Sequence, residues 1–326
     1  MNTQSIVERK RYLKFSTPAG RRSRFVRLLR RIWSVLVLPY TLVAAQRQGV
    51  PGIGYRVCCI GLGLRALLSG DVHRSMMLVT DPMDSFRYFE LEFAVIGAQH
   101  AKVKNYLDVS SPRLVAFLLL KDHPELIADL LNPVPEDLCE TMEAARSMGI
   151  DARCRPNSSL IEVANFPDAS FDLITSISVI EHIPGDCAAV ARMWNLLRPG
   201  GKLIITVPCA KEWCEEYTNL DEYSLLSKDT DGYVYWQRYY DEALLTERIW
   251  SVTGRPTRSK IYGEIKSGNY DTNVQRKRTD PSYPYWKEPI MLSKEYRYYD
   301  SLGEMPGMGV IAMEFTKPLA ANEGGR

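Results

Sequence analysis

The sequence predicts a doubly wound α/β fold, with a seven-stranded, mostly parallel sheet and an N-terminal helical extension. Two observations carry this prediction. From about residue 103 onward, short apolar segments alternate with segments of helical spacing, a pattern typical of parallel sheets. Within this region, LLRPGGKLIITVP contains a helix end, a Pro-Gly-Gly turn and a buried strand in succession. The 326 residues, 45% of them hydrophobic, suffice for one large domain with additions.

Each element is placed by its apolar pattern and its flanking turn residues. We expect strands at 105–109, 125–129, 159–163, 171–178, 202–207, 258–265 and 308–316, and helices at 113–121, 134–148, 186–197 and 240–253. Three parts follow: a basic, amphipathic arm with a helical preface (1–100), the main domain (101–320) and a disordered tail (321–326). Two polar, aromatic segments of the main domain, 209–239 and 267–307, have the length of lids over a binding site.

The N-terminal arm differs from the rest of the chain in charge. The net charge of +2 conceals a strongly basic segment at residues 9–31 and an acidic remainder. The apolar run 32–45 follows, but it is shorter than the roughly 20 residues of a membrane-spanning helix, and Pro39 interrupts it. Residues 9–45 therefore have two interpretations: a peripheral anchor on an anionic membrane surface, or a core helix with a solvated basic lead-in.

The cysteines favour a reducing compartment. Seven are scattered along the chain, none with the paired spacing of a zinc site, and only four histidines are present. We therefore expect free thiols, no metal site and a cytoplasmic protein, with membrane association as the open alternative. The segment RRSRF is similar to a twin-arginine export signal, but its Phe is displaced and no clean cleavage site follows.

One segment carries the spacing of a dinucleotide-binding loop, Gly61-x-Gly63-x-x-Ala66, with Asp81 about 20 residues further on. The strand context around Asp81 is poor, so we interpret these glycines as part of a closely packed helix or turn. An oxidoreductase that binds NAD(P) here is the weaker alternative.

A second candidate site lacks glycines but has the expected context. Asp108 closes the first strand of the main domain, a helix follows, and Asp129 closes the second strand about 20 residues later. In open α/β sheets, ligands bind beyond the carboxyl ends of the strands, where a carboxylate can accept hydrogen bonds from ribose hydroxyls.

Two longer motifs carry a family resemblance. The segments FPDASFDLITSISVIEHIPGD and LLRPGGKLIITVP, in this order and spacing, resemble the fourth- and fifth-strand segments of class I, Rossmann-like S-adenosylmethionine-dependent methyltransferases, especially the type-11 group. The resemblance covers roughly residues 103–208. It implies a methyltransferase with S-adenosyl-L-methionine as cofactor.

The resemblance also implies roles for individual residues. The first-strand loop would contact the methionine end of the cofactor, and Asp129 would bind the ribose. An extra residue before Pro133 lets Asn132 share that contact or replace Asp129. Residues after the third strand would flank adenine, and the end of the fourth strand would border the reactive methyl group. The cofactor-binding candidates are Asp108, Val109, Ser110, Ser111, Asp129, Asn132, Asn165, Ile177 and Ser178, with Glu162 and Val163 as alternatives to Asn165.

The first loop departs from the family pattern, because Ser110-Ser111-Pro112 stands where glycines are usual. S-adenosylmethionine has no phosphate, so the backbone does not need to approach it as closely as a dinucleotide. Ser111 can cap the following helix, Pro112 can be its first residue, and Arg113 can assist in binding the cofactor carboxylate. The alternative is that cofactor binding is lost and the chain is a catalytically silent Rossmann-like binding or scaffold protein.

The candidate catalytic residue is His182, at the end of the fourth strand, as a general base for an acceptor that must lose a proton. Glu181 is interpreted either as structural or as facing the substrate. Arg238 could bind an anionic acceptor, although a surface ion pair is favoured. The expected partner is a small-molecule or lipid-linked methyl acceptor. A nucleic-acid partner is not expected, because the basic, aromatic segment 274–289 contains no recognised RNA-binding motif.

Overall fold

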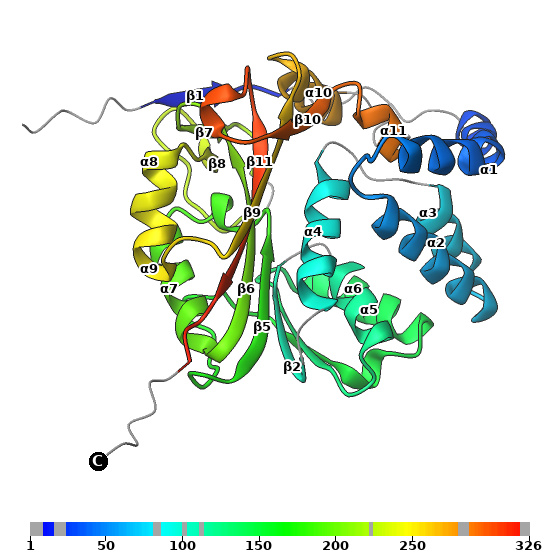
Figure 1. Cartoon of the computed structure of the whole chain (residues 1–326), viewed down its shortest axis with the longest axis horizontal. Helices are drawn as coiled ribbons and strands as arrows, with labels where there is room; N and C mark the ends of the chain where they lie inside the picture. Colours follow the sequence, from blue (N-terminus) through cyan, green and yellow to red (C-terminus); the bar gives the residue numbers. More distant parts are fainter. Residues whose placement is uncertain are drawn as a thin grey trace, which may run out of the picture.

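An eight-stranded sheet forms the centre of the computed structural model, which describes residues 9–15, 24–80, 86–99, 103–110, 114–221, 224–279 and 287–319 (Figure 1). The strand order is β10-β9-β11-β6-β5-β2-β3-β4. These strands are β2 (Asn105–Val109), β3 (Ile127–Leu131), β4 (Cys154–Asn157), β5 (Phe171–Ile177), β6 (Leu197–Cys209), β9 (Arg258–Glu264), β10 (Tyr296–Tyr299) and β11 (Gly309–Thr316). The predicted tail, 321–326, lies outside the described residues.

The predicted fold class is confirmed. Strands β4, β3, β2, β5 and β6 are parallel, and β11 runs antiparallel between β6 and β9. Strand β10, which pairs antiparallel with β9, adds an eighth strand from within the predicted insertion 267–307. Because five neighbouring strands are parallel, their carboxyl ends meet along one edge of the sheet.

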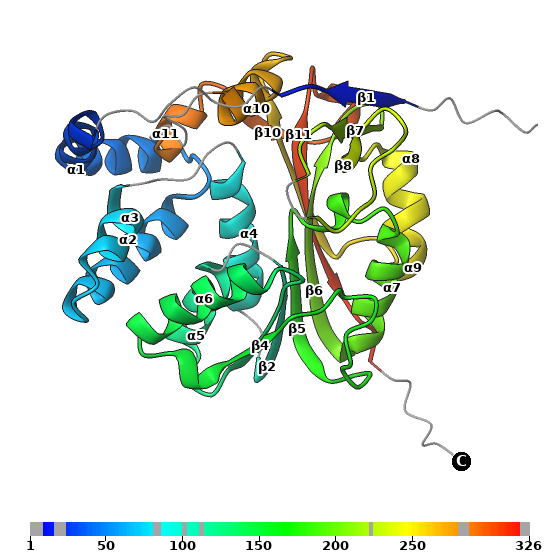
Figure 2. The ribbon, with the colours of Figure 1, turned by 180° about the vertical axis from the view of Figure 1, so that it is seen from behind.

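Helices cover both faces of the sheet (Figures 1 and 2). On one face lie α4 (Arg87–Gln99), α5 (Leu114–Asp122) and α6 (Pro135–Ser147). On the other lie α7 (Asp186–Leu196), α8 (Glu242–Leu245) and α9 (Ser251–Thr253), the last two joined by a π-helical turn. Each face has its own hydrophobic core, and α4 shares a core with α5 and the sheet. Part of the predicted helical preface thus belongs to the main core.

Two predicted strand positions are wrong. The strand expected at 125–129 is β3 at Ile127–Leu131, because the buried apolar residues continue to Leu130 and Leu131, which pair with the end of β2. The strand expected at 159–163 is not a strand, and β4 precedes it. Its apolar side chain Ile161 packs into a core from a loop instead of pairing in the sheet.

Three helices form a layer beside the main domain: α1 (Arg24–Arg47), α2 (Ile53–Leu68) and α3 (Val72–Thr80). Helix α1 continues through Pro39, so the predicted interruption there is wrong. Gly61 and Gly63 lie inside α2, which supports the interpretation as a packed helix. A Cβ on Gly63 would lie 2.7 Å from Cγ2 of Val79, so glycine permits the close approach of α2 and α3. Asp81 lies outside the described residues.

A buried ion pair ties this layer to the C-terminal half of the chain. The Arg56 guanidinium on α2 donates to both carboxylate oxygens of Glu288, at 2.9 and 2.8 Å, just before α11 (Pro289–Leu292). It also donates to the carbonyls of Leu78 and Val79, in the last turn of α3. One side chain therefore joins two helices and a distant segment.

The predicted insertion 209–239 contains a second, three-stranded sheet. It consists of β1 (Lys10–Leu13), β7 (Cys214–Thr218) and β8 (Val234–Tyr239), with β1 parallel to β7. Arg11 of β1 is paired with Glu216 and with Asp271 of α10 (Asn269–Thr279). The start of the basic arm is therefore part of the folded protein.

We predict that Arg56→Met lowers the free energy of unfolding by about 3 to 5 kcal/mol, because it leaves the Glu288 carboxylate buried without its ion-pair partner. Chemical denaturation monitored by circular dichroism measures this. Adding Glu288→Leu should restore much of the loss, and Arg74→Met, which breaks a partly exposed pair with Asp71, should cost less than about 1 kcal/mol. Equal losses of stability in Arg56→Met and Arg74→Met would contradict the conclusion that the Arg56–Glu288 pair is a buried tie between the helical layer and the C-terminal half.

Candidate active site

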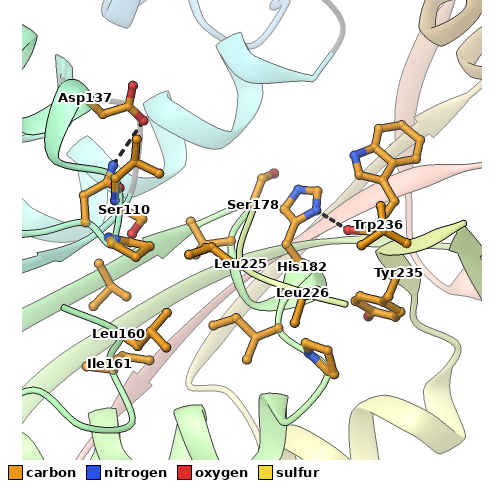
Figure 3. Close-up of a pocket in the computed structure, with 18 of the residues that line it drawn as sticks. Ser110, Asp137, Leu160, Ile161, Ser178, His182, Leu225, Leu226, Tyr235 and Trp236 are labelled. Carbon is orange, nitrogen blue, oxygen red and sulfur yellow. Dashed lines mark hydrogen bonds between the residues drawn. The ribbon is translucent and has the colours of Figure 1, made fainter. Parts of the chain in front are cut away.

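A cavity of about 270 Å³ opens at the carboxyl ends of β2, β3 and β5. The last residues of these strands and the residues directly after them line it, including Val109, Ser110, Leu131, Asn132 and Ser178. Figure 3 shows Ser110 and Asp137 at one side of the cavity and His182, Tyr235 and Trp236 at the other. This is the edge at which open α/β sheets bind their ligands.

Ser110 makes the turn at the end of β2 in the left-handed region, with φ of 52°. Its backbone N–H and its hydroxyl both donate to the Leu131 carbonyl, at 2.8 and 3.1 Å. These bonds offset the cost of a conformation that glycine adopts more easily. The loop therefore makes, with a serine, the turn for which the family uses glycine. Ser111, Pro112 and Arg113 lie outside the described residues, so their predicted roles stay predictions.

A polar pair occupies the end of β3. The Asn132 side chain accepts from the Val134 N–H at 2.9 Å and donates to Oδ2 of Asp137 at 3.4 Å. Asp137 lies in the first turn of α6 and lines the cavity beside Asn132. Sequence analysis missed Asp137, because its place in the cavity depends on where β3 ends and α6 begins. Together, the two side chains offer donors and acceptors that suit the hydroxyls of a ribose.

Asp129, the predicted ribose ligand, does not line the cavity. It lies in the middle of β3, paired with Leu107, and two further strand residues separate it from the edge of the sheet. Partial burial raises the pKa of its carboxyl, and the positive charge of Arg155 opposes that rise. The structure favours the alternative that Asn132 takes the position of the acid.

Three other predicted residues also lie away from the cavity lining. Asp108 is buried inside β2, where it accepts a hydrogen bond from Tyr106, whose hydroxyl also contacts Thr175. Ile177 is fully buried in the core, and Asn165 is exposed on a loop. Glu162, one of the weighed alternatives, does line the cavity. The strands that carry Asp108 and Ile177 were predicted to within one residue, so a place near the end of a strand did not decide whether the side chain faces the cavity.

His182 lines the cavity at the end of a short 3₁₀ turn (Ile180–His182) that follows β5. Its Nδ1 lies 2.5 Å from the Trp236 carbonyl oxygen (Figure 3). Because a carbonyl can only accept, Nδ1 carries the proton, and in the neutral ring Nε2 then holds the lone pair. Contact with β8 therefore fixes the tautomer that a general base requires.

Two buried carboxyl groups lie beside this turn. Glu90 of α4 is buried and accepts from the hydroxyls of Ser178 and, at 2.7 Å, Thr206. Oε1 of Glu181 lies 3.9 Å from Nε2 of His182, and its Oε2 has no hydrogen-bond partner within the described part of the chain. Burial, reinforced by the charge of Glu90, raises the pKa of Glu181 to about 8. Glu181 is therefore mostly uncharged at neutral pH.

The far side of the cavity is apolar and comes largely from the predicted insertion 209–239. Leu220, Leu225, Leu226, Val234 and Trp236 line it, and Thr218, Asp221 and Tyr235 are its polar members. Among the lining residues that the structure describes, His182 is the only basic side chain. This half of the cavity suits an uncharged, apolar ligand.

Arg238, considered as an anion ligand, lies outside the cavity. It is buried and paired with Asp186 at 2.6 Å and Glu215 at 2.7 Å. The favoured interpretation as an ion pair is therefore right, but the pair is buried and not at the surface. It joins the second sheet to α7.

Residues 136–205, from α6 to β6, match the type-11 family model described as a methyltransferase domain. A search of the curated proteins finds no match. Among solved structures, the chain is similar to the [4+2]-cyclase SpnF, at 14% identity and a TM-score of 0.46, over 73% of this chain and 85% of that one.

Two further structures are methyltransferases. A geranyl diphosphate methyltransferase in complex with SAM has 10% identity and a TM-score of 0.47, over 76% of this chain and 90% of that one. The 1,6-didemethyltoxoflavin-N1-methyltransferase of Burkholderia thailandensis has 16% identity and a TM-score of 0.43, over 78% and 88%.

The match over residues 136–205 confirms the predicted resemblance to type-11 methyltransferases, and the strand order confirms the predicted Rossmann-like sheet. The matched domain supports an enzyme that transfers methyl groups from S-adenosyl-L-methionine, its expected cofactor.

We predict that Asn132→Ala weakens S-adenosylhomocysteine binding about tenfold, because a hydrogen-bonding group at the ribose position is removed. Isothermal titration calorimetry measures the dissociation constant. Asp129→Asn is the matched control and should change it by less than about twofold. The opposite ranking would restore Asp129 as the ribose ligand.

We predict that Glu181→Gln becomes more stable relative to the wild type as the pH rises from about 5 to about 8. Between these pH values the Glu181 carboxyl keeps its proton in the folded wild type, where its pKa is raised to about 8, but has released it in the unfolded chain. The contribution of Glu181 to the free energy of unfolding therefore falls with pH, by up to about 1.4 kcal/mol per pH unit. Urea denaturation of both proteins across this range measures the difference. Parallel pH profiles would show that Glu181 is not buried in this way.

Proposed function

We propose that the protein transfers a methyl group to a hydroxyl of a small molecule with a large apolar part, with His182 as the general base. One observation supports this most strongly. A single cavity at the carboxyl edge of the parallel strands joins a polar half around Asn132 to an apolar half under residues 220–236, and His182 lines the cavity on the side of Trp236.

The residues of the polar half fit the cofactor. Asn132 and Asp137 match the ribose hydroxyls, and Leu160, Ile161 and Glu162 provide an apolar surface and a carboxylate where adenine is expected. The turn at Ser110 brings backbone groups to the methionine end. When bound, S-adenosylmethionine supplies a methyl group already activated by its sulfonium, so positioning the acceptor provides much of the rate enhancement.

His182 would take the proton of the acceptor hydroxyl on Nε2. The contact of Nδ1 with the Trp236 carbonyl orients the ring and leaves the lone pair on Nε2 to accept the proton. Transfer of the proton as the acceptor oxygen forms its new bond leaves a neutral ether and an imidazolium.

The apolar half supports an acceptor with a hydrocarbon or aromatic part. Five apolar side chains from one insertion line this half, and burying an acceptor against them is worth about 0.8 kcal/mol per methylene group. A lipid-linked acceptor has this character and is our proposal for the finer substrate class. A cytoplasmic location follows from the unpaired cysteines and is likewise proposed.

We predict that His182→Ala lowers kcat by about a hundredfold or more while leaving S-adenosylhomocysteine affinity within about twofold, since a general base typically contributes at least that factor. The enzyme, tritium-labelled S-adenosylmethionine and a small-molecule extract of the source cells are incubated, and label is counted in organic and aqueous phases. Wild-type label in the organic phase, lost with His182→Ala, supports the proposal.

Each part of the proposal has its own contradicting result. Label confined to the aqueous phase would contradict an apolar acceptor. Turnover by His182→Ala that equals the wild type at every pH would exclude His182 as the base. Tight S-adenosylhomocysteine binding without any transfer would favour the silent binding protein.

A further inference from the structure

Helix α1 turns a face of mostly small and polar side chains toward the protein, whereas most of its large apolar side chains face outward. The buried side chains are Ser34, Leu38, Thr41 and Ala45, and both hydroxyls are satisfied by carbonyls of α1 itself. The opposite face carries Phe25, Leu29, Ile32, Trp33, Leu36, Tyr40 and Val43, each at least half exposed, up to 76% for Tyr40. Their positions recur at helical spacing and form one stripe.

This arrangement reverses the usual amphipathic helix of a water-soluble surface, in which the apolar stripe faces the core. An apolar stripe of this length exceeds the scattered exposed hydrophobic residues of ordinary protein surfaces. The neighbouring helix α2 adds a second exposed stripe of Val57, Leu64 and Leu68. The outward face of the helical layer is therefore an extended apolar surface.

The charges around the stripe indicate what kind of partner covers it. The chain has no acidic residue between Glu8 and Asp71, whereas arginines occur near both ends of α1, at Arg30, Arg31 and Arg47. Such a surface attracts anionic lipid headgroups. A second copy of the chain would bring the same arginine-rich segment close to itself, which disfavours that occupant.

We propose that the stripe on α1 docks the enzyme onto an anionic lipid bilayer, with the helix lying in the plane of the interface. The segment Leu28–Arg47 has the length and composition of a membrane-spanning helix. The face of α1 opposite the stripe, however, packs on α11, α2 and α3, which holds the helix against the domain (Figure 1). The surface begins at α1 and not at residue 9, because β1 pairs with β7 in the second sheet.

The test is flotation of the full-length, detergent-purified protein with vesicles of equal parts phosphatidylcholine and phosphatidylglycerol. The variant Ile32→Glu/Leu36→Glu places two charges in the stripe. Leu319→Glu, at an exposed apolar residue beyond β11, is the matched control. We expect the wild type and the control to float, the double variant to float at least tenfold less, and vesicles of phosphatidylcholine alone to bind more weakly. Unchanged S-adenosylhomocysteine binding by the double variant shows that it is folded.

Two results would overturn the proposal. The first is a wild-type protein that does not float with anionic vesicles. If light scattering then shows a wild-type dimer that the double variant abolishes, the stripe binds a second copy of the chain instead of lipid. The second is equal flotation of wild type and double variant. Neither result bears on methyl transfer, which is measured separately.

Discussion

The carboxylate of Glu90 connects the helical part of the chain to the active-site edge of the sheet. From α4 it accepts the hydroxyls of Ser178, after β5, and Thr206, in β6, while the Ser178 N–H donates to the Thr206 hydroxyl. These bonds hold Ser178 in the left-handed region, with φ of 50°, and so direct the chain into the turn that presents His182. The position of the proposed base depends on this buried contact.

The cavity divides its tasks between two parts of the chain. The parallel strands supply the polar half, whose position follows from strand order and is common to the fold. The β7-β8 insertion supplies the apolar half and, through the Trp236 carbonyl, the tautomer of His182. In the proposed mechanism this added element therefore provides the wall that faces the acceptor and orients His182, and it can vary without disturbing the cofactor half.

Sequence reasoning predicted the sheet, most helices and the general place of the site, because apolar periodicity and the Pro-Gly-Gly turn are local signals. It placed Asp129 wrongly, because the end of β3 is decided by pairing with β2, which no local pattern shows. Glu90 and Asp137 were missed for a related reason. Glu90 lies 88 positions from Ser178 in the chain, and only the packing of α4 on the sheet brings the two together. The reversed orientation of α1 was equally hidden, since composition does not reveal which face is buried.

The central claim is that one cavity binds the cofactor at Asn132 and presents the acceptor to His182. A crystal structure with S-adenosylhomocysteine tests it most directly. The account predicts the ribose hydroxyls within hydrogen-bonding distance of Asn132 or Asp137, and the cofactor sulfur facing the space between His182 and the apolar wall. A ribose bound by Asp129, or a sulfur directed away from His182, would contradict it.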